Sequence, residues 1–143
     1  QTSATPGKTR LVNFFSVNGR FCFVDLPGYG FARVSRAEKE SWGPMVETYL
    51  RESARLRLVV SILDVRHDPT DQDRDLIEWL RHYGRRHLIV LTKSDKLSRG
   101  EALKRRRQIA SLFELGEDEA PILFSAQTGE GKAEVWRQIG RTL

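Results

Sequence analysis

The sequence predicts an α/β fold in which a mostly parallel sheet carries helices on both faces. Short apolar runs of strand length alternate with longer stretches in which apolar residues recur at helical spacing. Polar motifs follow directly after three of the apolar runs, as expected where parallel strands end at one edge of a sheet. The 143 residues, 39% hydrophobic and 30% charged, indicate one globular domain that spans residues 1–143.

Strands are expected at residues 10–16, 21–26, 58–64, 88–92 and 122–125. The first two are separated by Asn18 and Gly19, a pair typical of a tight hairpin, so we expect these strands to be antiparallel. The later connections are long enough to contain helices, which favours parallel pairing of the other strands.

Helices are expected after the second strand and after each later one. Three pairs have the spacing of capping boxes at helix starts: Ser35 with Glu38, Thr70 with Asp73, and Ser98 with Glu101. Gly84 is placed to end the helix that Thr70 begins. The side chains expected to face the core are Trp42, Met45, Val46, Tyr49, Leu50, Leu76, Ile77, Leu80, Tyr83, Leu103, Ile109, Ala110, Leu112, Phe113, Val135, Trp136, Ile139 and Leu143.

The tetrapeptide Thr92-Lys93-Ser94-Asp95, after the apolar run 88–91, has the chemistry to select a purine. An aspartate at the end of a buried strand can accept two parallel hydrogen bonds from N1 and N2 of guanine, which adenine cannot supply. Lys93 would lay its methylene stem along the base, and Thr92 would tie the loop to the phosphate side. Taken alone, the tetrapeptide also fits an ordinary turn with an aspartate cap.

Two further segments favour the nucleotide interpretation. Asp25-Leu26-Pro27-Gly28 follows the apolar run 21–24, where the carboxylate would hold a magnesium-bound water and the glycine amide would face a γ-phosphate. Ser125-Ala126 follows the run 122–124, where a backbone N–H can meet the guanine O6. Three such motifs in this order predict a site for GTP and GDP at the carboxyl ends of the strands.

Segments spread over most of the chain carry a likeness to a known family. They are Thr5-Pro6-Gly7-Lys8-Thr9, Asn13-Phe14-Phe15, Asp25-Leu26-Pro27-Gly28-Tyr29-Gly30-Phe31-Ala32, Trp42, Glu47-Thr48-Tyr49, Arg66-His67 and Thr92-Lys93-Ser94-Asp95-Lys96. Together they closely resemble the EngB (YihA/YsxC) family of bacterial GTP-binding proteins, and the eight residues that begin at Asp25 are the most specific part. The resemblance implies a Ras-like P-loop GTPase domain with Mg²⁺ as cofactor and slow intrinsic GTP hydrolysis.

The resemblance also implies partners and a location. We expect the protein to bind guanine nucleotide and the large ribosomal subunit with its rRNA, to act in assembly of that subunit, and to have a link to cell division and septation. We expect no DNA or membrane partner, a monomeric state and a bacterial cytoplasmic location. Cys22 is the only cysteine, which excludes an internal disulfide and suits a reducing compartment.

A phosphate-binding loop of the form G-x-x-x-x-G-K-[ST] is not found in this sequence. Gly7-Lys8-Thr9 resembles its end, but Thr2 stands where the first glycine belongs, and Ala126 does so for Gly131-Lys132. We therefore interpret Gly7-Lys8-Thr9 as the first switch loop. We expect the natural protein to carry a further strand, loop and helix of roughly 30 residues or more, with its strand between 21–26 and 58–64.

The expected nucleotide-binding residues are Gly7, Lys8, Thr9, Arg10, Leu11, Asp25, Leu26, Pro27, Gly28, Thr92, Lys93, Ser94, Asp95, Phe124, Ser125 and Ala126. The Thr9 hydroxyl would coordinate Mg²⁺ directly, and residues 7–11 would close over the γ-phosphate and ribose. Tyr29 follows Gly28 where many GTPases place a water-orienting glutamine, so no general base is named. We expect this chain by itself to bind nucleotide weakly.

The net charge of +5 and pI near 9.7 favour a polyanionic partner. The densest basic runs, 104–107 and 85–87, fit either RNA contact or a solvated helix face. An RNA-binding assembly module with a vestigial nucleotide pocket is the alternative function. A dinucleotide-dependent oxidoreductase is set aside because the sequence has no G-x-G-x-x-G turn.

Other polar residues are expected to be structural. The acidic residues from Asp64 to Asp73 match no zinc or calcium loop and fit a strand end followed by a capped helix. His82 and His87 are expected at the surface, near a helix end. Trp42, Trp79 and Trp136 have helical core or half-exposed spacings, so stacking on RNA bases is the less favoured role for each.

Overall fold

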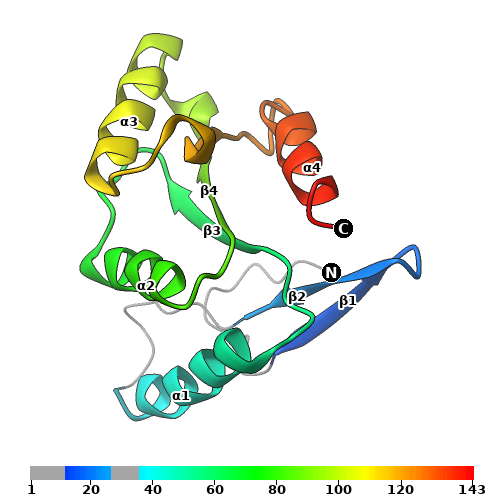
Figure 1. The fold of residues 1–143 in the computed structure, drawn as a ribbon. Coiled ribbons are helices and arrows are strands. Elements are labelled where there is room, and N and C mark those ends of the chain that lie inside the picture. The colour runs from blue at the N-terminus through cyan, green and yellow to red at the C-terminus, as the bar shows by residue number, and fades with distance from the viewer. Residues whose placement is uncertain (1–11, 27–35) are drawn as a thin grey trace. The chain divides into compact units, whose positions relative to one another are not determined.

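The computed structural model describes residues 12–26 and 36–143, without the side chains of residues 36–43. The chain divides into two compact units, residues 1–56 and 57–143. Each unit has its own sheet, and Figure 1 labels the elements of both.

A β-hairpin forms the first part of unit 1. Strands β1 (Asn13–Val17) and β2 (Phe21–Asp25) pair antiparallel, as the sequence predicted. Asn18 and Gly19 have φ angles of 52° and 65°. Asparagine and glycine tolerate this left-handed backbone better than other residues, which is why the pair reverses the chain tightly.

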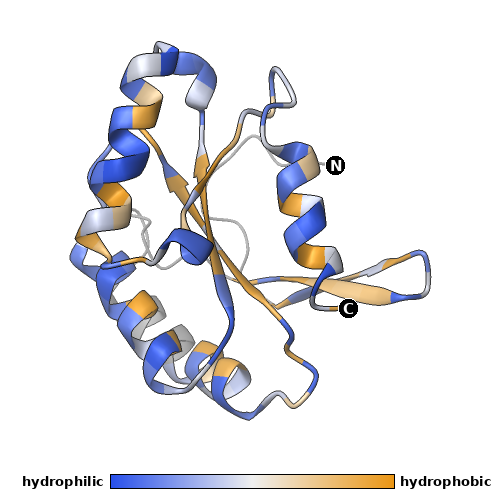
Figure 2. Ribbon diagram, turned by 45° about the horizontal axis from the view of Figure 1, so that its top comes forward, coloured by the Kyte–Doolittle hydropathy of each residue, from blue (hydrophilic) through white to orange (hydrophobic). Residues whose placement is uncertain are grey.

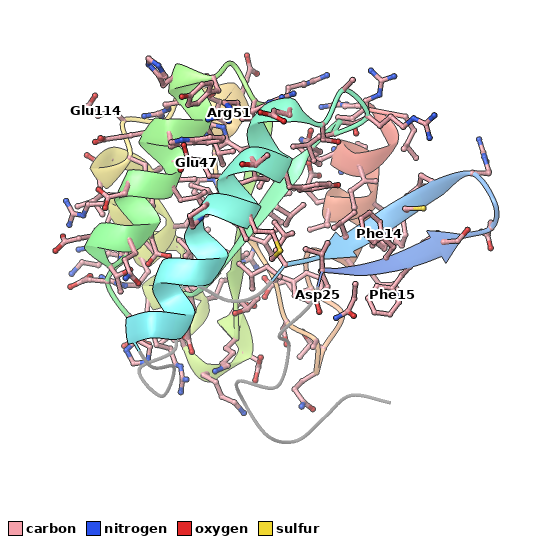
Figure 3. The ribbon with its side chains drawn as sticks, turned by 90° about the horizontal axis from the view of Figure 1, so that it is seen from below. Phe14, Phe15, Asp25, Glu47, Arg51 and Glu114 are labelled. Atoms are coloured by element: carbon pink, nitrogen blue, oxygen red, sulfur yellow. The ribbon has the colours of Figure 1, made fainter. Side chains whose placement is uncertain are left out.

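Helix α1 (Arg36–Glu52) also belongs to unit 1. Leu50 is buried, whereas Met45, which the sequence placed in the core, is exposed. Glu47 and Arg51 form an ion pair of 3.7 Å one turn apart on the helix surface (Figure 3). The predicted cap of Ser35 with Glu38, and the side chain of Trp42, lie outside the described residues.

Unit 2 contains a parallel sheet in the order β3-β4-β5. Its elements are β3 (Val59–Asp64), α2 (Asp71–His82), β4 (His87–Thr92), the 3₁₀ helix η1 (Ser94–Lys96), α3 (Arg99–Leu112), the 3₁₀ helix η2 (Glu117–Glu119), β5 (Ile122–Leu123) and α4 (Lys132–Gly140). Helices α2 and α3 are the crossovers that parallel pairing requires.

The core of unit 2 lies on both faces of β4. Leu88 and Val90 cluster with Ile122 of β5, and Val135 of α4 packs against this cluster. Since side chains alternate along a strand, Ile89 lies on the opposite face, where it is also buried. Figures 1 and 2 show the apolar strands between α4 on one side and α2 with α3 on the other.

Strands β2 and β3 are both edge strands among the described strands. β2 pairs with β1 alone, and β3 pairs with β4 alone. The sequence predicted these two unpaired edges, on the expectation that a further strand belongs between residues 21–26 and 58–64.

Two predicted helix caps are confirmed. The hydroxyls of Thr70 and Ser98 accept hydrogen bonds from the N–H groups of Asp73 and Glu101, at 3.2 and 3.3 Å, and both acidic side chains bond back. Gly84, with φ 60°, follows the last turn of α2 as predicted.

Several residues expected in the core are instead exposed. They are Tyr83, Leu103, Leu112, Trp136 and Leu143. The buried side chains Ala102 and Ile109 of α3 and Phe113, which caps its end, share one narrow stripe. Leu103 and Leu112 lie about 100° to either side of this stripe. His87, expected at the surface, is half-buried because it is the first residue of β4.

Candidate nucleotide site

The carboxyl ends of β4 and β5 are held together by backbone hydrogen bonds. Phe124 N–H donates to Leu91 O at 2.8 Å, and Ser94 N–H donates to Phe124 O at 3.2 Å. The sequence had placed Phe124 and Ser125 within the last strand, but β5 ends at Leu123 and both residues lie beyond it. These bonds bring the tetrapeptide after β4 and the Ser125 segment to one edge of the sheet.

Asp95 and Ser125 meet at this edge. The Ser125 hydroxyl donates to Asp95 Oδ1 at 2.7 Å, and Lys96 Nζ lies 3.2 Å from Oδ2. The hydrogen bond from Ser125 lowers the pKa of the Asp95 carboxyl; partial burial opposes this shift and Lys96 supports it. The carboxylate is therefore ionised at neutral pH, and each oxygen keeps a lone pair for a further donor.

Ser125 is fully buried and organises the loop that follows it. Its hydroxyl oxygen accepts from the N–H groups of Gln127 and Thr128, both at 3.2 Å. Its own N–H donates to Glu130 O at 3.1 Å, so it is not the donor for a guanine O6. Within the described part of the chain, no group accepts a hydrogen bond from Ala126 N–H, which leaves Ala126 as the candidate donor for O6.

Glu130 connects the loop after β5 to the loop after β4. Ser94, which is buried, donates from its hydroxyl to Glu130 Oε2 at 2.5 Å. The next residue, Gly131, has φ 76°, and a Cβ at this position would collide with Leu123 O. Only glycine can occupy this close approach, so the backbone itself fixes where Glu130 lies.

Lys93 has a left-handed backbone, with φ 61°, and its Nζ lies 2.9 Å from Asp64 Oδ2. Asp64 is the last residue of β3 and is paired in register with Thr92 of β4. Arg66 binds the same carboxylate through Nε at 2.9 Å and Nη2 at 2.7 Å. The Arg66 guanidinium, against the opposing effect of burial, holds the pKa of Asp64 well below its usual range, and Lys93 adds to this.

Arg105 of α3 holds the loop that carries Arg66. Its Nε donates to Val65 O at 3.1 Å, and its Nη2 donates to His67 O and Asp68 Oδ1, both at 2.8 Å. This arginine belongs to the basic run 104–107, for which the sequence offered a solvated face or RNA contact. Its guanidinium is instead a structural clamp.

The structure places the remaining predicted residues as follows. The Thr92 hydroxyl donates to Leu63 O at 3.0 Å, so it ties β4 to β3. Phe124 is half-buried against the Leu88 cluster. Asp25, exposed at the end of β2, and Leu26 belong to unit 1. Gly7, Lys8, Thr9, Arg10, Leu11, Pro27 and Gly28 lie outside the described residues.

Three of the four acidic residues from Asp64 to Asp73 have structural partners, as expected. Asp73 caps α2, Asp68 binds Arg105, and Asp64 binds Arg66. In the described part of the chain, no group of three or more histidine, cysteine, aspartate or glutamate side chains is arranged to hold a metal ion.

Sequence reasoning assigned no nucleotide role to Asp64, Arg66 or Glu130. Glu130 is 36 residues from Ser94, so no local pattern reveals their contact. For Asp64 the parallel pairing of the strands was a usable signal. The register places Asp64 beside Thr92, and Lys93 is the next residue after Thr92.

Comparison with known proteins identifies the family of the chain. A family model described as 50S ribosome-binding GTPase matches residues 1–93. The probable GTP-binding protein EngB of Syntrophus aciditrophicus (strain SB) is 56% identical over 139 residues, which are 97% of this chain and 70% of that protein. The probable GTP-binding protein EngB of Geobacillus sp. (strain WCH70) is 47% identical over 143 residues, covering 100% of this chain and 74% of the relative.

Solved structures agree on the fold. A crystal structure of a probable GTP-binding protein EngB superposes with a TM-score of 0.79 at 16% identity, over 93% of this chain and 83% of that chain. Era in complex with MgGDPNP and nucleotides of 16S ribosomal RNA gives a TM-score of 0.73 at 19% identity, over 99% of this chain and 47% of Era. The fold is that of a Ras-like P-loop GTPase.

The chain belongs to the EngB family of GTP-binding proteins. Guanine nucleotide is therefore the ligand class, and GTP hydrolysis is the reaction class. Among the described residues, no helix combines the length and the apolar character needed to cross a bilayer.

Proposed function

We propose that the protein is a guanine-nucleotide-dependent switch that acts in assembly of the large ribosomal subunit and hydrolyses GTP slowly. The observation that carries the nucleotide part is the ionised Asp95 carboxylate, oriented by the buried Ser125 hydroxyl at 2.7 Å. A fixed carboxylate of this kind matches the N1 and N2 donors of guanine, whereas adenine has no N–H donor at positions 1 and 2.

The phosphate side of the proposed switch depends mainly on residues outside the described part of the chain. Residues 7–11 would close over the γ-phosphate and ribose, and Gly28 would detect the γ-phosphate. The Asp25 carboxylate is exposed at a strand end, and a hard oxygen of this kind suits a water bound to Mg²⁺. Mg²⁺, held by Thr9 and that water, would neutralise phosphate charge.

The proposed ribosomal partner can be tested through the positive charge of α3. Lys104, Arg106 and Arg107 of α3 form no ion pairs within the described part of the chain, so their charge is available to phosphate groups. Binding of the protein to large-subunit particles should weaken steeply as salt rises. Affinity that is indifferent to salt would contradict phosphate contact.

Family membership supports the remaining parts of the proposal, which concern location, oligomeric state and wider role. We propose a cytoplasmic monomer with a link to cell division and septation. We also expect this chain by itself to bind nucleotide weakly, because its sequence has no G-x-x-x-x-G-K-[ST] motif.

Titration of labelled GDP and ADP against the full-length protein, with and without Mg²⁺, tests the central proposal. We expect GDP binding that depends on Mg²⁺ and at least about a hundredfold weaker binding of ADP, because adenine leaves Asp95 unpaired. Equal affinity for both purines would overturn guanine recognition. Binding to ribosomal particles without any nucleotide binding would favour an assembly module with a vestigial pocket.

A further inference from the structure

We propose that Asp64 is a positioning residue for guanine nucleotide: it holds the Lys93 ammonium so that the lysine stem is ordered beside the base site before nucleotide arrives. The inference rests on the proposed function of the Asp95 site. Its structural basis is that β3 and β4 end side by side, with Asp64 in register with Thr92 and Lys93 next along the chain.

The lysine is held at both ends of its side chain. Its backbone is left-handed, which fixes the direction in which the side chain leaves β4, and its Nζ lies 2.9 Å from Asp64 Oδ2. The methylene stem must therefore span the ends of two neighbouring strands. A flexible lysine loses rotamer freedom when it packs on a ligand, so a stem that is already ordered binds at lower entropic cost.

The ion pair restricts the side chain of Lys93, whereas Asp64 has other hydrogen-bond partners without it. Arg66 alone already covers both carboxylate oxygens, through Nε to Oδ1 and Nη2 to Oδ2, and its backbone N–H adds a bond of 3.1 Å to Oδ1. Lys93 is 54% exposed in its side chain and could be solvated by water. Asp64 is only 19% exposed, which makes it the fixed member of the pair.

The loop that bears Arg66 is anchored independently of Lys93. Arg105 bonds to the carbonyls of Val65 and His67 and to the carboxylate of Asp68. Asp68 is thus an acidic residue of the same loop that makes no contact with Lys93 in the structure, and its side chain is 84% exposed. It provides a matched control for removing a negative charge near the site.

The first test measures GDP affinity of the full-length protein, together with its melting temperature. Asp64→Asn should weaken GDP binding by about fivefold to tenfold, mainly through faster dissociation, and Asp68→Asn should change it by less than about twofold. Lys93→Met should weaken binding by a similar factor. The double variant Asp64→Asn/Lys93→Met should bind no more weakly than Lys93→Met alone, because Asp64 acts through Lys93.

A second readout separates positioning from general loosening of the site. Lys93 contacts the face of the base, whereas Asp95 contacts its edge, so Asp64→Asn should leave the ratio of GDP to IDP affinity unchanged. Asp95→Asn, which loses the edge contact, should alter that ratio. A purely structural role of Asp64 would weaken GDP binding by the same factor whether Lys93 is present or already replaced by methionine, and this additivity would overturn the inference.

Two further outcomes are decisive. If Asp64→Asn does not fold, Lys93→Arg replaces it: an arginine that keeps the ion pair should bind GDP within about threefold of the unsubstituted protein, whereas Lys93→Met should not. Equal loss in both Lys93 variants would overturn the inference. An unsubstituted protein without guanine preference would instead overturn the proposed function itself, so the two failures are distinguishable.

Discussion

The buried Ser125 hydroxyl donates a 2.7 Å hydrogen bond to the Asp95 carboxylate, although the two residues lie in loops that follow different strands. The bond both orients the carboxylate and lowers its pKa, which are the two properties that guanine recognition requires. The Ser94–Glu130 hydrogen bond joins the same two loops at a second point.

Ser125→Ala should weaken GDP binding by about tenfold, because Asp95 loses the group that orients it. The same change removes the acceptor for the Gln127 and Thr128 N–H groups, so we expect the free energy of unfolding to fall by about 2 kcal/mol. Calorimetric titration and chemical denaturation measure the two effects. Ser111→Ala, at an exposed position of α3, is the control and should change neither.

Asp95→Asn should exchange the preference for guanine nucleotides for one toward xanthine nucleotides, because the amide offers one donor and one acceptor where the carboxylate offers two acceptors. We expect GDP affinity to fall by about a hundredfold and XDP affinity to exceed it. Competition between labelled GDP and unlabelled XDP provides the measurement. A variant that still prefers guanine would show that Asp95 does not read the base.

Gly131→Ala should destabilise the protein by about 3 kcal/mol, because the new methyl group would collide with Leu123 O and the left-handed backbone would be strained. Gly131 directly precedes α4, and Gly140 is the last residue of that helix. Gly140→Ala has no atom within 4 Å of the new Cβ and should be neutral or slightly stabilising. Thermal unfolding of the two variants compares them directly. Equal stability would mean that the loop after β5 can relax around a side chain.

Ser98→Ala should lower the free energy of unfolding by about 1 kcal/mol, since the hydroxyl that caps α3 would be lost. Loss of the cap should also speed hydrogen exchange at the Glu101 amide, which donates to this hydroxyl. Ser98→Asp keeps an acceptor at this position and should restore most of the stability. No restoration would mean that Ser98 stabilises the helix in another way.

Asp64 should make the stability depend on pH in the acidic range. Its pKa is lowered in the folded protein, so its stabilising effect is complete above about pH 5 and declines as pH falls through the unfolded value of about 4. Asp64→Asn should therefore cost about 1 kcal/mol at neutral pH and less at about pH 3. Denaturation at several pH values measures this gap, and a gap that is constant with pH would contradict the ion-pair explanation.

Structural features that depend on neighbouring residues are predicted well from the sequence. The hairpin turn at Asn18 and Gly19 and the caps at Thr70 and Ser98 each depend on residues within three or four positions, and each is confirmed. The alternation of strands and helices also predicted the parallel sheet, because a crossover helix leaves few other ways to pair the strands.

The parts that could not be predicted depend on contacts between distant positions. Nothing local joins Lys93 to Asp64 or Ser94 to Glu130, since these pairs form only when the strand ends meet. The exposed Leu103 shows a second limit: an apolar residue near a helical stripe is buried only if a neighbouring element covers it.

Arg105 gives helix α3 a mechanical role. Its guanidinium donates hydrogen bonds to two carbonyl groups of the segment after β3. A tilt or shift of the helix would therefore move that segment as well. A macromolecule that binds the neighbouring cations of α3 and shifts the helix would therefore also displace Arg66.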